Sequence, residues 1–297
     1  MKKFAAWWLA MRPKTLSVSV VPVLVGTALA YFERGTFVWW PALAALLAAM
    51  LIQIGTNLYN DVGDFERGAD TAERLGPPRA TAQGWLSARA VRRGAQVVFV
   101  LALLIGLALA AWGGWPIVLI GILSLISGWA YTGGRWPIAY SPLGELFVMV
   151  FFGVVAVSGT YYLQTFSVSK AALIAGVMLG SFAAAVITVN NTRDIHADAK
   201  AHKRTLAVRL GRRAMNAVYA FELMLPFTLL PWLALQTHTG VWMALPALAG
   251  VFAVTLYRRF CAAEGVVFNA LLAATAKLQL IFALLLVGTL LFQAISF

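Results

Sequence analysis

About nine long apolar stretches, separated by short polar or glycine- and proline-containing segments, dominate the chain. A membrane-spanning helix needs about 20 mostly apolar residues, and each of these stretches comes close to that length. The sequence therefore predicts an all-α integral membrane protein, a bundle of about nine transmembrane helices. We expect these helices near residues 16–32, 39–58, 94–112, 115–131, 144–165, 171–192, 217–236, 241–257 and 274–296.

The composition is that of a membrane protein. Apolar residues make up 61% of the chain and charged residues 11%. Typical soluble domains have about 45–50% apolar and about 25% charged residues. We interpret residues 1–297 as a single transmembrane domain. Because Cys261 is the one cysteine in the sequence, a disulfide framework and a cysteine-based metal site are excluded.

Lysine and arginine are divided unevenly between the two sides of the predicted bundle. With the N-terminus placed inside, all but Arg34 and Lys170 of the 23 Lys and Arg residues fall in inner segments. Positively charged loops stay on the cytoplasmic side, so we expect a multi-pass protein of the inner (cytoplasmic) membrane with a cytoplasmic N-terminus. The net charge of +12 then reflects topology and attraction to anionic lipid headgroups, and it requires no nucleic-acid partner.

The first dense group of polar side chains, at residues 57–84, follows directly on the second apolar stretch. On a helix that continues at 100° per residue, Asn57, Asn60, Asp61 and Asp64 fall within about a third of the circumference. Acidic groups near the C-terminus of a helix oppose its dipole. A cation should therefore compensate these acids, and a divalent metal is the natural candidate.

A second polar stretch, at residues 190–211, follows the sixth apolar stretch. Its pattern N-N-x-R-D-x-x-x-D is similar to the earlier N-x-x-N-D-x-x-D, which indicates a weak internal duplication. If the bundle brings the two helix ends together, their carboxylates face each other in one site. We expect this site in a central cavity that opens to the cytoplasmic side.

The energetic cost of charge in a membrane limits where these acids can lie. A carboxylate at the bilayer centre costs about 2.5–3.5 kcal/mol, so the acids should lie near the inner interface, line a polar cavity or be neutralised by cations. Mg²⁺ binds one or two carboxylates together with substrate phosphates, and arginine contacts phosphates bidentately. A metal–diphosphate site beside an apolar cavity suggests ionisation of a lipid-linked diphosphate, that is, electrophilic prenylation.

Several shorter motifs accompany the two aspartate motifs. They are Arg12-Pro13-Lys14-Thr15-Leu16, Gly68-x-Asp70, Gly76-Pro77 with Arg79, Tyr131-Thr132-Gly133-Gly134, Leu143-Gly144-Glu145-Leu146 and Lys203-Arg204-Thr205-Leu206. Taken together, from residue 12 to about residue 211, the chain resembles the UbiA superfamily of membrane aromatic prenyltransferases. Within it, the chain is most similar to the members that prenylate 1,4-dihydroxy-2-naphthoate in menaquinone biosynthesis. It departs from the family pattern at His202, where Gly is usual, and at Arg135-Trp136, where Pro or Lys is expected.

The resemblance implies roles for individual residues. The carboxylates that would hold Mg²⁺, and thereby take part in catalysis, are those of Asp61, Asp64, Asp194 and Asp198. The amides that would assist them are those of Asn57, Asn60 and Asn190. The basic residues that would contact the diphosphate are Arg67, Arg79, Arg193, Lys203 and Arg204. The candidates for acceptor positioning, proton removal or substrate binding are Tyr131, Tyr140 and Glu145.

The reaction implied by the resemblance is Mg²⁺-dependent transfer of a polyprenyl group from polyprenyl diphosphate to 1,4-dihydroxy-2-naphthoate. It releases diphosphate and CO₂ and gives demethylmenaquinone. The alternative is a sister prenyltransferase that acts on 4-hydroxybenzoate, homogentisate or a tetrapyrrole. An alternative from another class is a polytopic transporter. Transporters usually place charged sites near mid-membrane on broken helices, whereas the acids here end helices on one side.

Overall fold

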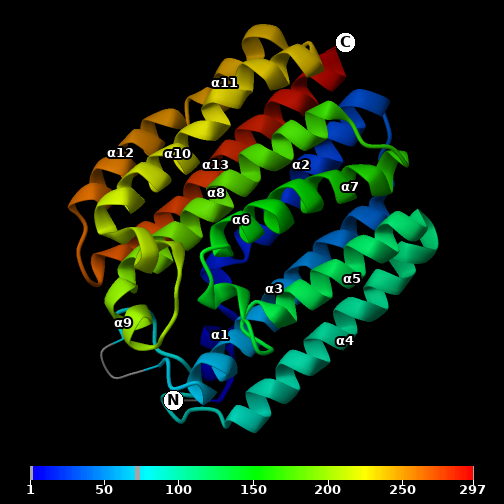
Figure 1. Ribbon diagram of the computed structural model, residues 1–297. Helices are drawn as coiled ribbons and strands as arrows, with labels where there is room; N and C mark the ends of the chain where they lie inside the picture. Colours follow the sequence, from blue (N-terminus) through cyan, green and yellow to red (C-terminus); the bar gives the residue numbers. More distant parts are fainter. Residues whose placement is uncertain (1–2, 71–73, 297) are drawn as a thin grey trace.

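The protein is a bundle of long helices that run roughly alongside one another (Figure 1). The computed structural model describes residues 3–70 and 74–296. Every regular element in these ranges is helical, which confirms the all-α prediction. The first helix and the end of the last helix lie at opposite ends of the bundle.

The first half of the chain supplies one side of the bundle. Its elements are α1 (Lys3–Met11), η1 (Pro13–Thr15), α2 (Ser17–Arg34), α3 (Trp39–Glu66), α4 (Ala88–Gly113), α5 (Trp115–Ala130), η2 (Ile138–Tyr140), α6 (Gly144–Met149), η3 (Val150–Val155) and α7 (Ala156–Thr165). η3 is a π-helical segment, and α6, η3 and α7 together form one membrane-length helix.

The second half of the chain packs against the first along α8. Its elements are α8 (Lys170–Arg193), α9 (Ile195–Lys200), α10 (Leu206–Thr237), η4 (Gly240–Met243), α11 (Ala244–Ala247), α12 (Gly250–Ala262) and α13 (Val267–Ser296). α10 is kinked at Gly211, whose φ of 78° and ψ of 167° are not helical. The helix begins at Leu206, earlier than residue 217, where the apolar stretch predicted it to start.

All nine predicted stretches are largely helical, although residues 248–249 interrupt the stretch 241–257 between α11 and α12. The number of spans differs from the prediction. Seven helices within the described ranges are long and apolar enough to cross a membrane, and α2 adds an eighth only together with α1 and η1 across a bend of 47°. α5 has 16 residues, fewer than the about 20 that a span needs. The structure thus supports seven or eight spans, and the predicted count of nine is not confirmed.

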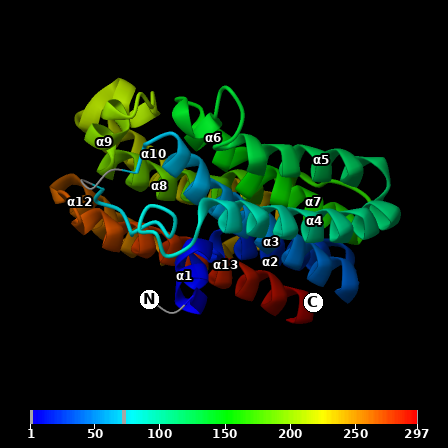
Figure 2. The same cartoon turned by 90° about the horizontal axis from the view of Figure 1, so that it is seen from below.

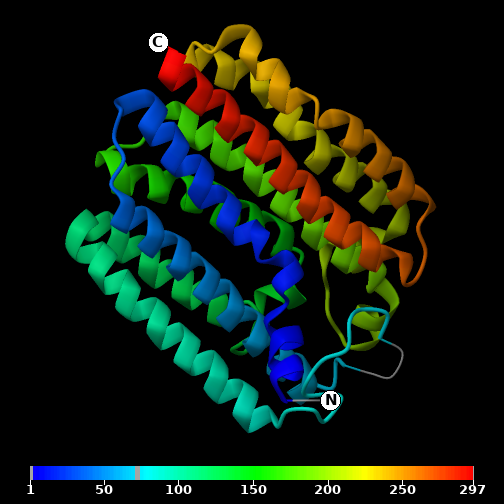
Figure 3. The ribbon, with the colours of Figure 1, turned by 180° about the vertical axis from the view of Figure 1, so that it is seen from behind.

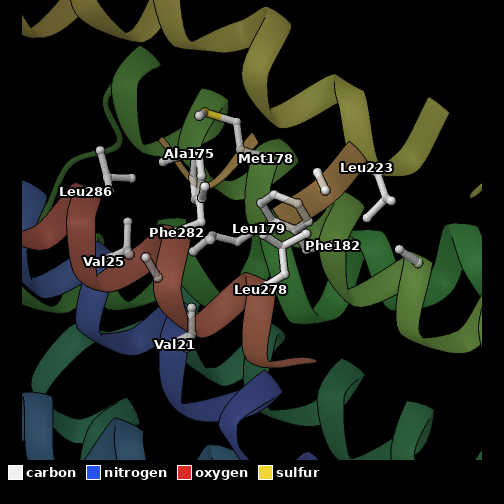
Figure 4. Packing of buried hydrophobic residues seen from close by; sticks show 14 of the residues in the cluster. Val21, Val25, Ala175, Met178, Leu179, Phe182, Leu223, Leu278, Phe282 and Leu286 are labelled. Atoms are coloured by element: carbon white, nitrogen blue, oxygen red, sulfur yellow. The ribbon is translucent and has the colours of Figure 1, made fainter. Parts of the chain in front are cut away.

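α8 is the central helix of the bundle, and most of its residues are buried. Its many alanines and glycines allow neighbouring helices to approach closely. Around it, Phe182 packs edge-on against Phe282 of α13, with ring centroids 5.2 Å apart. Figure 4 shows these rings together with Leu179, Leu223 of α10 and Val21 of α2 in one continuous core.

The α6–η3 helix crosses α8 with backbone against backbone. A Cβ atom added at Gly180 would lie 2.2 Å from the carbonyl oxygen of Met149. A Cβ added at Gly153 would lie 2.2 Å from a carbonyl oxygen of α8. Both positions therefore require glycine, and this contact fixes the depth at which α6 and η3 lie in the bundle.

The long polar connections gather at one end of the bundle (Figures 1 and 3). They are the α3–α4 connection, the segment 131–143 that contains η2, and α9 with residues 201–205. Seen along this end, the α3–α4 connection lies between α9 and α1 (Figure 2). The connections between α2 and α3, and between α4 and α5, are short and lie at the other end. Both predicted acidic helix ends therefore meet on the same side.

The glycine contact between α6–η3 and α8 is testable. Gly180→Ala should destabilise the protein by roughly 1–3 kcal/mol, because the added methyl group forces the two backbones apart. Gly288→Ala on α13 is the matched control, since nothing lies within 4 Å of a Cβ there. Thermal unfolding in detergent should show a lower midpoint for the first variant only. Equal midpoints in the two variants would contradict the close contact.

Candidate functional site

A polar cavity of about 50 Å³ lies among the gathered connections. Its lining combines acidic and basic side chains with amides and one tyrosine. The charged and aromatic members include Asp64, Asp194, Asp198, Arg79, Lys203 and Tyr131. This confirms that the two acidic helix ends face one another across a shared space.

A larger, almost wholly apolar cavity of about 380 Å³ lies between α2, α3, α4, α5 and the α6–α7 helix. Its aromatic lining includes Phe147 and Phe151, whose stacked rings have centroids 4.6 Å apart. Tyr131, at the end of α5, lines both this cavity and the polar one. The two cavities are therefore neighbours, with Tyr131 between them.

The last turns of α3 present Asn60 and Asp64 to the polar cavity, because residues four apart share a face of a helix. Asp64 is only 2% exposed. Its Oδ1 accepts hydrogen bonds from Tyr140 Oη at 3.0 Å and contacts Lys203 Nζ at 3.1 Å. Its Oδ2 accepts from Arg79 Nη2 at 2.6 Å. Each oxygen of this buried acid thus has a cationic partner.

Asn57 and Asp61 lie on the neighbouring face of α3 and bond to other parts of the protein. The Asp61 carboxylate accepts the backbone N–H groups of Ala80 at 2.9 Å and Thr81 at 3.0 Å, and also the Thr81 hydroxyl. Asn57 donates to the Met11 carbonyl at 3.0 Å. Asp61 therefore anchors the loop that carries Arg79, and its oxygens do not line the polar cavity.

Asp70 joins the acidic site although the sequence analysis assigned it no role. Gly68 ends α3 with a φ of 67°, and the chain turns back so that the N–H of Ala69 donates to the Asp64 carbonyl at 2.9 Å. Asp70 Oδ1 then pairs with Arg74 at 2.6 Å, while its Oδ2 is buried and has no partner among the described residues. The Gly68-x-Asp70 motif was the available signal, because glycine after a helix marks such a turn.

Asp194 and Asp198 lie one turn apart at α9, and both line the cavity. Arg193 donates to both oxygens of Asp194, at 2.8 Å from Nε and 2.6 Å from Nη2. Asp198 lies 3.6 Å from Lys203 Nζ. Burial raises the pKa of Asp198 to about 6, although the Lys203 ammonium acts in the opposite direction.

The five predicted basic residues occupy three kinds of position. Arg79 and Lys203 line the cavity. Burial alone would lower the pKa of Arg79, but the surrounding carboxylates outweigh it and raise this pKa. Arg193 lies behind Asp194 and does not line the cavity. The other two, Arg67 and Arg204, are exposed and hold loops at the rim.

These rim contacts hold the two loops next to the cavity. Arg67 donates to the carbonyl oxygens of Thr132 at 2.6 Å and Gly134 at 2.8 Å. The backbone N–H of Arg204 donates to the Tyr140 carbonyl at 3.0 Å. Both residues thus position the tyrosine-containing segment 131–143.

Two further arginines, Arg12 and Arg74, line the cavity and were not predicted to. Arg12 precedes Pro13 and has a left-handed φ of 55°. Its guanidinium has no hydrogen bond or ion pair with any residue in the described ranges. The Arg12-Pro13 motif was noted in the sequence, but a local pattern does not show that α1 folds against the end of α3.

Tyr140 and Glu145 occupy different positions relative to the cavity. The Lys203 ammonium lies 4.7 Å from the centre of the Tyr140 ring. Burial and Asp64 raise the pKa of Tyr140, so its hydroxyl remains a hydrogen-bond donor at neutral pH. Glu145 is 5% exposed and lines neither cavity. It accepts a hydrogen bond at 2.9 Å from Asn191, which does line the polar cavity.

The two departures from the family pattern, His202 and Arg135-Trp136, lie at a left-handed backbone position and on the exposed surface, respectively. His202 has a left-handed φ of 56°, a conformation that glycine adopts without steric cost. Arg135 and Trp136 are exposed, and the guanidinium lies 5.5 Å from the Trp136 ring centre. These two side chains stack on each other at the surface and do not enter the cavity.

The donor set of the polar cavity fits a hard divalent cation. Among the described residues, no group of three His, Cys, Asp or Glu side chains is arranged to hold an ion by itself. Mg²⁺ typically binds one or two carboxylates and completes its shell with water and substrate phosphates. The carboxylates of Asp64, Asp194 and Asp198 line the cavity and supply such oxygen ligands. Asp70 does not line it, but it is joined to Asp64 through Arg79, and its Oδ2 has no partner among the described residues.

Comparison with known proteins gives consistent results. The UbiA prenyltransferase family model matches residues 19–267. A 1,4-dihydroxy-2-naphthoate octaprenyltransferase of Haemophilus influenzae is 37% identical over 268 residues, which cover 84% of each chain. A protein of the same name from Mycobacterium tuberculosis is 40% identical over 219 residues, or 74% of each chain.

Among solved structures, a UbiA homolog from Archaeoglobus fulgidus bound to DMAPP and Mg²⁺ has the same fold. The TM-score is 0.71 at 14% identity, covering 96% of this chain and 99% of that one. The transporter alternative is not supported by any of these matches. The protein is an aromatic prenyltransferase embedded in the membrane, and its chain belongs to the UbiA prenyltransferase family.

Proposed function

We propose that this prenyltransferase transfers a polyprenyl group from polyprenyl diphosphate to 1,4-dihydroxy-2-naphthoate, with Mg²⁺, and releases diphosphate and CO₂. The observation that carries the proposal is the adjacency of the two cavities, because Tyr131 lines both. A charged head group and a long apolar chain of one substrate fit such a pair. The names of the Haemophilus influenzae and Mycobacterium tuberculosis relatives support the naphthoate as acceptor.

The diphosphate occupies the polar cavity in this proposal. The basic side chains that contact it are Arg12, Arg74, Arg79 and Lys203, which all line the cavity. The carboxylates that hold Mg²⁺ are those of Asp64, Asp70, Asp194 and Asp198. Neither Asp61 nor Asp70 lines the polar cavity. Asp70 replaces Asp61 in this set, because both Asp61 oxygens bond to the loop at Ala80 and Thr81, whereas Asp70 Oδ2 has no partner among the described residues. When bound, Mg²⁺ neutralises the diphosphate and makes it a better leaving group.

The prenyl chain occupies the apolar cavity of about 380 Å³. Its lining excludes water from the reacting carbon and holds the chain in an extended groove between helices. Phe147, Phe151 and Tyr131 line this cavity, and an aromatic ring that presents its face to a nearby cation stabilises it. The allylic cation left after departure of the diphosphate is therefore protected at the junction of the two cavities.

The proposed reaction balances without loss of a ring proton. The bond between the first prenyl carbon and the diphosphate oxygen breaks, and the diphosphate keeps the electron pair. The ring carbon that bears the carboxylate forms the new C–C bond while the neighbouring hydroxyl gives up its proton. The resulting β-keto acid loses CO₂, and the oxygen regains a proton. The product of this step is therefore the quinol form, and the quinone demethylmenaquinone forms from it only by a separate two-electron oxidation. Tyr140 orients Asp64 through its hydrogen bond. Glu145 positions the acceptor through the amide of Asn191, which lines the polar cavity.

The positive charge of the inner segments supports an orientation for the enzyme. We infer that the polar cavity opens to the cytoplasm and that the N-terminus lies on the same side of the inner membrane, because positively charged segments remain cytoplasmic. Both substrates then reach the site from the cytoplasmic side, the donor laterally from the bilayer and the acceptor from water.

The reaction can be tested directly with purified protein, Mg²⁺, a polyprenyl diphosphate and 1,4-dihydroxy-2-naphthoate. Mass spectrometry should detect a prenylated product that has lost CO₂, and chelation of the metal should stop its formation. Parallel reactions with 4-hydroxybenzoate, homogentisate and a tetrapyrrole test the alternative acceptors. Turnover with one of these, and none with the naphthoate, would refute the proposed acceptor.

Asp64→Asn should lower turnover on the order of a hundredfold or more at every Mg²⁺ concentration, because a direct ligand is lost. Asp61→Asn should instead weaken binding of the polyprenyl diphosphate, since the loop that carries Arg79 loses its anchor, while the Mg²⁺ dependence keeps its shape. Steady-state kinetics over a range of Mg²⁺ and donor concentrations separate the two effects. Identical kinetic changes in both variants would show that Asp61 also serves the metal.

The Mg²⁺ requirement should depend on pH. Asp198 has a raised pKa of about 6, so it is ionised above that value and gains a proton as the pH falls through it. The Mg²⁺ concentration for half-maximal activity should therefore rise between pH 7.5 and pH 5.5. In Asp198→Asn this dependence should be weaker. An unchanged Mg²⁺ requirement across the range in the wild-type enzyme would argue against Asp198 as a ligand.

A further inference from the structure

Asn269, near the start of α13, lies outside the motifs of the sequence, yet it contacts Arg193 and Leu75, which adjoin the cavity-lining residues Asp194 and Arg74. Its Oδ1 accepts a hydrogen bond from Arg193 Nη1 at 2.7 Å. Its Nδ2 donates to the backbone carbonyl of Leu75 at 2.8 Å. One amide thus joins the end of α8 to the α3–α4 connection, and Figure 3 shows the start of α13 beside that connection.

Arg193 in turn holds groups that do line the cavity. Its Nε and Nη2 donate to the two oxygens of Asp194, and Nη2 also donates to Asn190 Oδ1 at 2.9 Å. Arg193 is 4% exposed, so its guanidinium is surrounded by protein. Because Asn269 holds the remaining nitrogen, Nη1, the plane of the guanidinium is fixed. The orientation of Asp194 therefore depends on Asn269.

The α3–α4 connection depends on the same contact. Leu75 adjoins Arg74, which lines the cavity and pairs with Asp70 at 2.6 Å. At the next residue, Gly76, a Cβ would lie 2.7 Å from Arg193 Nη2. Only glycine therefore allows the chain to lie directly against the guanidinium. The hydrogen bond from Asn269 to Leu75 keeps it there.

We propose that Asn269 is a positioning residue of the active site. It orients Arg193, and through it Asp194, and it fixes the backbone at Leu75 so that the arginines of the connection face the cavity. The inference rests on the proposed function, in which these groups bind Mg²⁺ and diphosphate. Because Asn269 does not line the cavity, it acts on binding of the metal–diphosphate more than on the chemical step.

The test compares three variants. Asn269→Ala removes both hydrogen bonds, whereas Asn269→Asp keeps an acceptor for Arg193 and loses the donor to Leu75. Asn216→Ala is the matched control, because Asn216 accepts from Arg212 Nη1 at the same 2.7 Å and neither residue lines a cavity. Titration calorimetry measures the affinity for a non-ionising prenyl thiodiphosphate with Mg²⁺.

Asn269→Ala should lower this affinity and raise the KM for polyprenyl diphosphate by about tenfold, the effect of one lost hydrogen bond to a charged group, with a smaller change in kcat. Asn269→Asp should be intermediate, and Asn216→Ala should match the wild type. In the Arg193→Gln background, Asn269→Ala should have a smaller effect than in the wild type, because only its hydrogen bond to Leu75 then remains to be lost.

Hydrogen exchange of substrate-free protein gives a second readout that is independent of activity. The backbone amides of Arg74, Leu75, Gly76 and Arg79 should exchange faster in Asn269→Ala than in the wild type. Unchanged exchange and affinity in Asn269→Ala, fully additive effects with Arg193→Gln, or an equal effect of Asn216→Ala would each overturn the inference. If the wild type shows no prenyl transfer, the proposed function fails, while the exchange measurement still decides the role of Asn269.

Discussion

Acidic side chains buried at one end of a membrane-embedded bundle must have cationic partners, and the rest of this structure depends on how they obtain them. A carboxylate removed from water without a counter-charge is costly. Here Asp64 pairs with Arg79 and Lys203, and Asp194 pairs with Arg193. These pairs join residues of α3, α8 and the connections after them, so the charge network also holds the polar end of the bundle together.

The same network suits phosphoryl groups. A site that combines carboxylates with arginine and lysine binds a divalent cation and the anion that accompanies it, because each component neutralises the others. Beside it lies the apolar cavity that we propose for the chain of the isoprenoid substrate. Backbone contact at Gly153 and Gly180 sets where the α6–η3 helix lies, and this helix contributes the aromatic faces of that cavity. The packing of the core thus positions the aromatic side chains that line the apolar cavity.

Much of this arrangement could be predicted from the sequence. Hydrophobic stretches located the helices, and the charge pattern placed both acidic helix ends on one side. The two aspartate motifs predicted that Asp64, Asp194 and Asp198 share one site, and all three line the polar cavity. The number of spans was less accessible, because hydropathy alone does not show that α5 stops after 16 residues or that α2 bends away from α1.

Other features of the site depend on tertiary structure that no local pattern encodes. Asp61 and Asp64 are three residues apart on one helix, and only the fold of the following loop shows that the first bonds to Ala80 and Thr81. Asp70 reaches the site because the chain turns at Gly68. Asn269 meets Arg193 from a distant part of the sequence. The proposed internal duplication of the two motifs stays a prediction.

The central claim is that Asp64, Asp70, Asp194 and Asp198 together hold divalent cations against a prenyl diphosphate. The most direct measurement is anomalous diffraction from crystals grown with Mn²⁺, in place of Mg²⁺, and a non-ionising prenyl thiodiphosphate. The account predicts metal peaks in the polar cavity, coordinated by oxygens of these aspartates and of the diphosphate. Peaks coordinated by Asp61, or a diphosphate bound elsewhere with no metal beside these aspartates, would contradict it.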